Sequence, residues 1–118
     1  MHIEAFREYC LSKKGVEETF PFDEVTLVFK VMGKMFALTG LERDEFTVNL
    51  KCDPEWSETL RESYPAIQPG YHMSKKHWNT VSFEDDLEHK LLLQLIDHSY
   101  DLVVAKLKKA DRELLNSL

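Results

Sequence analysis

Hydrophobic and polar residues alternate in several stretches of the chain, which is the period of a β-strand with one buried face. The clearest alternation places Leu27 and Phe29 on one side and Thr26 and Lys30 on the other. The same pattern predicts that Phe36 and Leu38 both belong to the core. The predicted strands are Val25–Val31, Met35–Leu41, Phe46–Cys52 and Lys76–Phe83, with a turn at Gly33, a charged turn at Glu42–Glu45 and a turn at Pro69-Gly70.

Three segments carry helical spacing of their apolar residues instead. The first covers residues 2–14 and ends at Gly15, and the second begins at Asp53-Pro54 and is stopped by Pro65. A long closing helix is expected after Asp85-Asp86, and the tail Lys108–Leu118 either continues it or frays. Between the first helix and the first strand, a loop over Val16–Glu24 is expected, with its Phe20-Pro21-Phe22 segment packed on the core. The closing helix has the apolar stripe Leu87, Leu91, Leu92, Leu95, Ile96, Tyr100, Val103, Val104 and Leu107.

This order predicts an α+β fold, a two-layer sandwich of an antiparallel sheet of about five strands with helices on one face (α-β3-α-β2-α). Its 118 residues are expected to form a single domain, 1–118, that needs no disulfide. No apolar run is long enough to cross a bilayer, and no signal peptide is recognisable, so we expect a cytoplasmic protein with reduced Cys10 and Cys52. Helices on one face leave the other sheet face to solvent or to a partner.

Charge is sorted along the chain, whose net charge is −6. The stretches Val25–Leu41, Phe46–Cys52 and Ser63–Phe83 contain five lysines and none of the 21 Asp and Glu residues. One interpretation is a cationic face for an anionic partner. The other is that strands simply disfavour acidic residues.

Strand alternation assigns a set of cationic and aromatic residues to the uncovered face or its edges. An exposed tryptophan among lysines would suit stacking beside phosphate contacts. Alternatively, the tryptophan packs on the tail or in a homodimer, because aromatic residues are enriched at interfaces. The candidate binding residues are Lys30, Lys34, Lys51, Lys75, Lys76, His77, Trp78 and Tyr71.

Other potential chemistry is weak in the sequence. Asp97-His98-Ser99 has the residue types of a catalytic triad, but neighbouring residues on a helix point in different directions. His72, His77 and Cys52 lack a diagnostic metal-binding spacing, and the acids at 84–86 suit a helix N-terminus. No phosphate-binding glycine loop or nucleophile elbow is present. We therefore predict neither catalysis nor a metal or other cofactor.

Several blocks of the sequence resemble the MmcQ/YjbR family, and the similarity spans roughly Phe6 to Lys106. The blocks follow one another in the order typical of that family. They are Phe20–Phe22, Thr26–Val31, Lys34–Leu38, Leu50–Glu55, Tyr64–Ile67, Pro69–Met73, Lys75–Val81 and His98–Val103.

The resemblance implies a frataxin-like or secretion-chaperone-like α+β domain, a "double wing" label and DNA binding, with no catalytic residue set. The first hypothesis is therefore a nucleic-acid-binding module that uses the lysine-bearing face. The alternative is a protein-interaction or chaperone-like adaptor, with Trp78 anchoring a peptide or second subunit. A small-molecule or metal site around Tyr71, His72, His77 and Cys52 is a third possibility. The expected state is a monomer or a weak homodimer without membrane contact.

Overall fold

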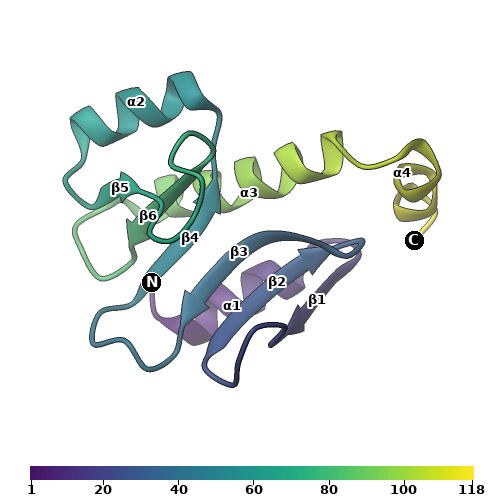
Figure 1. Ribbon diagram of the computed structural model, residues 1–118, viewed down its shortest axis with the longest axis horizontal. Coiled ribbons are helices and arrows are strands. Elements are labelled where there is room, and N and C mark those ends of the chain that lie inside the picture. Colours follow the sequence, from purple (N-terminus) through teal and green to yellow (C-terminus); the bar gives the residue numbers. More distant parts are fainter.

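The computed structural model describes residues 1–118 and contains a six-stranded antiparallel sheet with helices packed on one of its faces (Figure 1). The strand order is β1-β2-β3-β4-β6-β5. The α+β fold class and the open antiparallel sheet are thus confirmed. In chain order the elements are α1 Ile3–Leu11, β1 Val16–Thr19, β2 Thr26–Val31, β3 Lys34–Gly40, β4 Thr47–Lys51, α2 Pro54–Ser63, β5 Ile67–Pro69, β6 Trp78–Ser82, α3 His89–Ala105 and α4 Lys109–Asn116.

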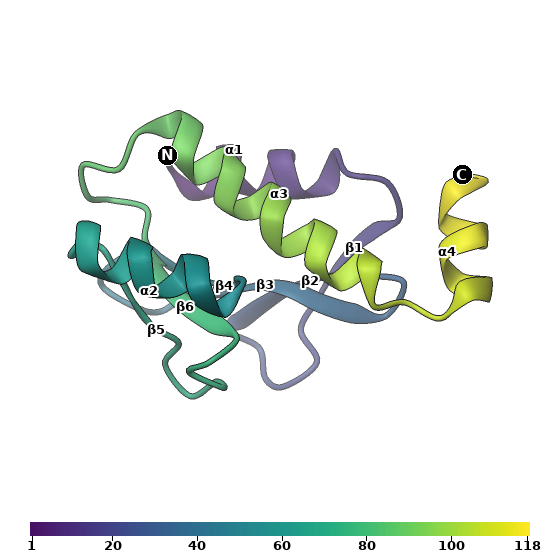
Figure 2. The same ribbon diagram turned by 90° about the horizontal axis from the view of Figure 1, so that it is seen from above.

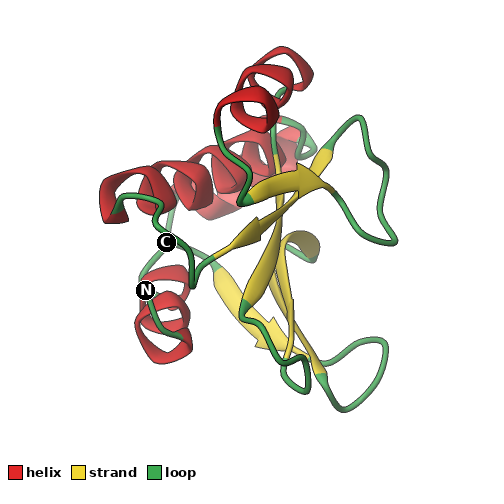
Figure 3. Ribbon diagram, turned by 90° about the vertical axis from the view of Figure 1, so that its left-hand side faces the viewer, coloured by secondary structure: helices red, strands yellow, loops and turns green.

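The main core lies between the sheet and the helices, with α1 and α3 side by side over one sheet face (Figures 2 and 3). Phe6 of α1 makes edge-to-face contacts with the rings of Phe29, Phe46 and Phe83. Leu92, Leu95, Ile96 and Val103 of α3 are buried in the same core, as the predicted stripe requires. The face that α1 and α3 do not cover is called the open face below.

One strand was not predicted. The segment expected as a loop forms β1, which pairs with β2 in the register Val16 with Val31 and Glu17 with Lys30. The prediction failed because Glu17 and Glu18 interrupt the apolar pattern that marks a strand. An edge strand such as β1 nevertheless tolerates charged residues well. Glu18 forms an ion pair with Arg7 of α1, which fastens this edge to the helix layer.

Phe36 and Leu38 are both buried, as predicted, but a β-bulge places them on opposite faces of the sheet. The register of β2 with β3 shifts between Phe29, which pairs with Ala37, and Lys30, which pairs with Met35. The extra residue, Phe36, turns into the main core together with Ala37. Leu38 is therefore moved to the open face, where it pairs with Val28.

The start of α2 follows the prediction. Asp53 is the N-cap, and its carboxylate accepts hydrogen bonds from the backbone N–H groups of Glu55 and Trp56. Pro54 follows at the first helical position. The helix ends before Tyr64, whose extended backbone is the conformation that the following proline favours.

The C-terminal part of the chain differs from the prediction at both ends of the closing helix. Asp85 and Asp86 lie in bends before the helix, which begins at His89. Beyond it, the tail neither continues α3 nor frays but forms a separate helix, α4. Leu115 of α4 enters the core directly over Gly15, where an added Cβ would lie 2.4 Å from the leucine Cδ1. A local periodicity cannot reveal this long-range contact.

Candidate functional site on the open face of the sheet

The open face carries its own small apolar cluster. Val28, Leu38 and Trp78 are buried there, and the side chains of Met35 and Met73 pack against them. Strand alternation correctly placed Trp78 on this face. Trp78 of β6 pairs there with Lys51 of the neighbouring strand β4. The expectation of an exposed indole is wrong, because only 6% of Trp78 is accessible. Trp78 therefore forms the floor of the site and does not offer a free stacking surface.

A hollow of about 340 Å³ lies at one end of this cluster and is called the lysine hollow here. Its lining combines three lysines with three apolar residues: Lys34, Met35, Lys51, Trp78, Val103 and Lys106. The Lys51 Nζ lies 5.8 Å from the centre of the Trp78 ring, which is a cation–π distance. Burial, and then the nearby Lys106 charge, lower the pKa of Lys51 below its usual value.

The hollow lies where β3 and β4 part. Their register is limited to Ala37 with Leu50 and Leu38 with Asn49. At the next position, the Ser99 hydroxyl of α3 stands between the strands, donating to the Phe36 carbonyl at 2.5 Å and accepting from the Lys51 N–H at 2.8 Å. The serine thus satisfies two backbone groups that would otherwise pair with each other. This wedge separates the strand ends that carry Lys34 and Lys51.

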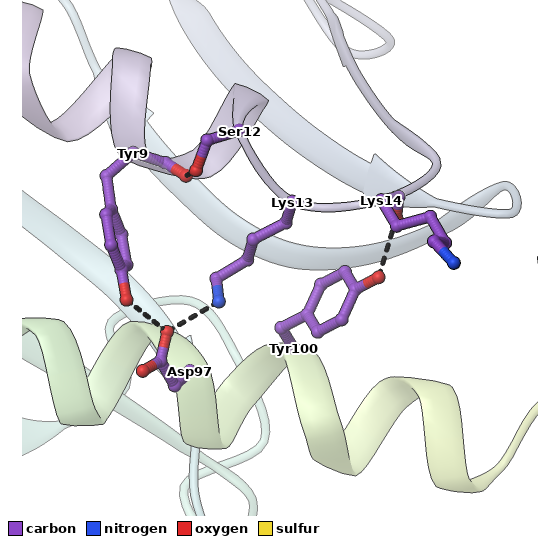
Figure 4. Close-up of polar contacts among 6 residues, drawn as sticks. All are labelled: Tyr9, Ser12, Lys13, Lys14, Asp97 and Tyr100. Atoms are coloured by element: carbon purple, nitrogen blue, oxygen red, sulfur yellow. Dashed lines mark hydrogen bonds and ion pairs between the residues drawn. The ribbon is translucent and has the colours of Figure 1, made fainter. Parts of the chain in front are cut away.

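Asp97, His98 and Ser99 point in three directions, as the helix geometry predicted. The Asp97 Oδ1 accepts from the Tyr9 hydroxyl at 2.6 Å and from the Lys13 Nζ at 2.5 Å, which joins α3 to α1 (Figure 4). Burial and the aspartate raise the pKa of Tyr9 to about 12. His98 accepts a hydrogen bond at its Nε2 from the Asp53 N–H. Each residue therefore anchors a different element.

A second depression, of about 350 Å³, lies at the other end of the apolar cluster and is called the aromatic groove here. Phe22 and Tyr71 form part of its wall and are 64% and 58% exposed. The Arg43 guanidinium lies 5.5 Å from the Tyr71 ring centre, and the His72 ring lies 4.0 Å from it. The expectation that Phe20-Pro21-Phe22 packs on the core is thus wrong, since its aromatic rings face solvent.

The floor of the aromatic groove is held by a polar network. Asn49 accepts a hydrogen bond from the Thr80 hydroxyl at 2.6 Å and donates to the Tyr71 carbonyl. The Thr80 hydroxyl in turn accepts from the Tyr71 N–H. His72, the next residue, has φ 59°, a left-handed conformation that is uncommon outside glycine. The network fixes the loop that presents Tyr71.

The predicted site residues separate into groups. Lys34, Lys51 and Trp78 meet in the lysine hollow, while Tyr71 lines the aromatic groove. Lys30 lies on the open face outside both, with Glu17 as its cross-strand neighbour, which the unpredicted β1 supplies. The remaining candidates, Lys75, Lys76 and His77, are exposed on the loop before β6 and line neither depression.

The loop that carries these three residues is held in place by α2. The Arg61 guanidinium donates to the Lys75 carbonyl at 2.6 Å, to the Trp78 carbonyl at 3.2 Å and to the Asn79 side chain at 2.8 Å. The His77 carbonyl accepts from the Cys52 N–H. Three charge-assisted bonds from one guanidinium give this loop a defined position beside the sheet.

Sequence reasoning missed three residues of the two depressions. Lys106 follows the apolar stripe of α3, and only the approach of that helix to β3 and β4 brings it to the hollow. Arg43 stands among acidic residues in the turn after β3 and therefore lies outside the acid-free stretches that suggested a cationic face. Phe22 had been assigned to the core. The sequence showed that two phenylalanines lie close together at Phe20 and Phe22, but it did not show that the Phe22 ring is exposed.

No group of three or more His, Cys, Asp or Glu side chains lies close enough together to hold a metal ion. Both cysteines are buried and free, and burial raises the pKa of the Cys10 thiol to about 12. A protonated, buried thiol is a poor nucleophile. No helix of the chain is both long and apolar enough to span a bilayer.

Fold and site together define a class: a small α+β domain whose open sheet face joins a lysine-lined hollow to an exposed aromatic groove. The YjbR family model matches residues 11–102, and the chain belongs to this family. It is 40% identical to the uncharacterised protein YbdF of Escherichia coli O157:H7, over 93% of this chain and 90% of that protein. It is 32% identical to the uncharacterised protein YjbR of E. coli K12 over the full length of both.

Solved structures share the fold. The crystal structure of Deinococcus radiodurans protein DR2400 is similar with a TM-score of 0.89 and 44% identity, covering 96% of this chain and 86% of that one. A crystal structure from Pseudomonas syringae matches with a TM-score of 0.74 and 30% identity, covering 86% of this chain and 98% of that one.

Proposed function

We propose that this protein binds nucleic acid on the open face of its sheet, and that the bound segment is single-stranded. The observation that carries the proposal is the placement of three lysines and of two exposed aromatic rings at opposite ends of one apolar cluster. Lysines pair with backbone phosphates, while aromatic rings stack on bases. Stacking on a side chain requires bases that are not already stacked in a duplex.

Each depression supplies a different part of the binding energy. Lys34, Lys51 and Lys106 contact phosphates at one end, and Arg43 adds a fourth cation beside the aromatic groove. Phe22 and Tyr71 offer stacking surfaces, which replaces the role first assigned to Trp78. The net charge of −6 opposes binding elsewhere on the molecule, so the strand is confined to this face.

Fluorescence anisotropy with a labelled single-stranded oligonucleotide, measured across a series of salt concentrations, tests the proposal. With four phosphate contacts, the slope of log K against log salt concentration should be about −3 for a single strand. The double variant Lys34→Met/Lys51→Met should make that slope less negative by about 1.4. Tyr71→Ala should weaken binding through a lost stacking contact worth about 1–3 kcal/mol, with the slope unchanged.

Lys90→Met is the matched control, since Lys90 is an exposed lysine at the opposite end of α3. It should leave affinity and slope as in the wild type. The absence of binding at low salt, or equal affinity for duplex and single strand, would refute the proposal.

A second candidate function is a protein contact through Phe22 and Tyr71. It is favoured by the exposure of these two large rings in one groove, because isolated exposed hydrophobic residues are common but clustered ones mark interfaces. Trp78, buried as it is, does not serve as the anchor. Self-association measured by analytical ultracentrifugation, and its loss in Phe22→Ala, would favour this reading over nucleic-acid binding.

A further inference from the structure

The lysine hollow differs from an ordinary cationic surface because the sheet itself is opened to form it. Ser99 holds apart the ends of β3 and β4, and Trp78, Met35 and Val103 supply apolar walls. Its volume of about 340 Å³ lies in the range of small-ligand pockets. The space therefore has an apolar lining as well as a charged one.

The three ammonium groups around the hollow are uncompensated. No carboxylate lines it, and none of Lys34, Lys51 and Lys106 takes part in an ion pair. Like charges gathered in a partly buried place repel one another, and this repulsion by Lys106 adds to burial in lowering the pKa of Lys51. A bound anion would remove this repulsion, and an anion of charge −2 would do so better than one of charge −1.

The end of α3 competes only weakly with that anion for the ammonium groups. The carbonyls of Val103 and Val104, in its last turn, accept hydrogen bonds from the Lys106 and Leu107 N–H groups. The partial negative charge of the helix terminus is thereby partly satisfied within the chain. The lysine ammonium groups remain as the polar groups that line the hollow.

We propose that the lysine hollow is a binding site for a phosphomonoester, whose phosphate pairs with Lys34, Lys51 and Lys106 while the group that bears it contacts Met35, Trp78 and Val103. A phosphomonoester carries a charge of about −1.5 to −2 at pH 7, whereas each internal phosphodiester of a strand carries −1. The ligand chemistry thus fits a free mononucleotide or the phosphorylated end of a strand. The inference goes beyond nucleic-acid binding and stands without it.

Isothermal titration calorimetry of the full chain distinguishes a free mononucleotide from the phosphorylated end of a strand as the ligand. The ligands are adenosine monophosphate, adenosine, inorganic phosphate, and one short oligonucleotide with either a 5′-phosphate or a 5′-hydroxyl group. We expect adenosine monophosphate to bind about tenfold or more tightly than adenosine, because the charge-assisted contacts are lost without the phosphate. Inorganic phosphate should bind more weakly than the monophosphate, since it lacks the apolar contacts.

Substitutions then locate the site. Lys51→Met and Lys106→Met should each weaken adenosine monophosphate binding by about tenfold. Lys106→Arg should retain most of the affinity, and Lys90→Met should retain all of it. A thermal melt of every variant establishes that the fold is intact, and Lys106 is exposed enough for its replacement to leave the core untouched.

The outcomes distinguish the two proposals. Equal affinity for the phosphorylated and hydroxyl oligonucleotides, with no binding of the monophosphate, would overturn this inference and leave nucleic-acid binding in place. Binding of the monophosphate without binding of either oligonucleotide would support this inference and refute nucleic-acid binding. Equal losses in Lys106→Met and Lys90→Met would overturn it as non-specific charge attraction.

Discussion

At the scale of single residues, the most consequential side chains join distant parts of the chain through a single hydrogen-bonding atom. His98 is one of them, because its Nε2 accepts from the N-cap residue Asp53 while its ring packs edge-on against Trp56. Burial lowers its pKa below the ordinary value of 6.5, in spite of the nearby Asp53 and Asp101 charges. The folded protein therefore favours the neutral imidazole.

This preference makes stability depend on pH. In the unfolded chain the imidazole takes up a proton at about pH 6.5, whereas in the folded chain it does so only at lower pH. The stabilisation from neutral His98 is thus complete above pH 6.5 and is lost as the pH falls through the folded pKa. Urea denaturation gives the free energy of unfolding at pH 7.5 and at pH 5.5. The difference between the two values should be smaller in His98→Gln than in the wild type, because the glutamine amide oxygen can accept the same hydrogen bond but does not titrate.

His89→Gln provides the control, since His89 is exposed at the start of the same helix. Its pH dependence should match that of the wild type. The same pH dependence in His98→Gln and the wild type would contradict the assignment.

At the scale of elements, the fold depends on how α3 meets the sheet. Ser99 replaces a direct β3–β4 contact with two bonds through its hydroxyl group, and the bulge at Phe36 adapts β3 to this geometry. The wedge thus connects the packing of a helix to the shape of the lysine hollow. Ser99, which does not line the hollow, thus separates the strand ends that carry Lys34 and Lys51.

Ser99→Ala should have two measurable effects. The Phe36 carbonyl and the Lys51 N–H lose their partner, which should lower the free energy of unfolding by about 1–3 kcal/mol. If the two strands close to pair these groups directly, the hollow narrows, and phosphomonoester affinity should fall although all three lysines are intact. Chemical denaturation and calorimetry measure the two effects, and Ser63→Ala, at an exposed serine in α2, is the control. Unchanged stability together with unchanged affinity would contradict the role of the wedge.

Several elements were predictable because their residues satisfy a local rule. The strand period in β2 and β4 assigned Leu27, Phe29, Val48 and Leu50 to the correct face, although Val28 on the other face of β2 is buried as well. The Asp53-Pro54 start of α2 follows from capping, which involves only neighbouring residues. β1 and the separate α4 were missed because a short charged strand and a polar helix are fixed by what they contact.

At the scale of the whole molecule, α1 and the two lysines that follow it are held to α3, which lies far along the chain, by polar contacts. The Asp97 carboxylate accepts from Tyr9 and Lys13, and the Tyr100 hydroxyl donates to the Lys14 carbonyl at 2.6 Å (Figure 4). The Lys13 Nζ also lies 5.0 Å and 5.1 Å from the Tyr9 and Tyr100 ring centres. This cluster fastens the first helix to the third across the core.

Asp97→Ala should lower the free energy of unfolding by about 1–2 kcal/mol, because Tyr9 and the largely buried Lys13 lose a charged acceptor. The moderate size reflects the partial exposure of the aspartate. Asp101→Ala, four residues along the same helix and exposed, should change stability by less than about 0.5 kcal/mol. Equal effects of the two substitutions in guanidinium denaturation would contradict the assignment.

The candidate site was predictable only in part. Strand alternation placed Lys51 and Trp78 on the correct face, because facing direction follows from the period of a strand. The approach of Lys106 to these residues, and that of Arg43 and Phe22 to Tyr71 in the aromatic groove, could not be predicted, since Lys106, Arg43 and Phe22 come from a helix end and two loops. Nor could alternation show that Met35 and Met73 cover the indole.

The sequence by itself determined the fold class and the face on which Lys51 and Trp78 emerge, because strand period and helix capping act between neighbouring residues. The tertiary structure decided where the sheet opens, which side chains are covered and which cations converge. These features depend on contacts such as Ser99 with Phe36 and Leu115 with Gly15, and such contacts join residues far apart in the chain.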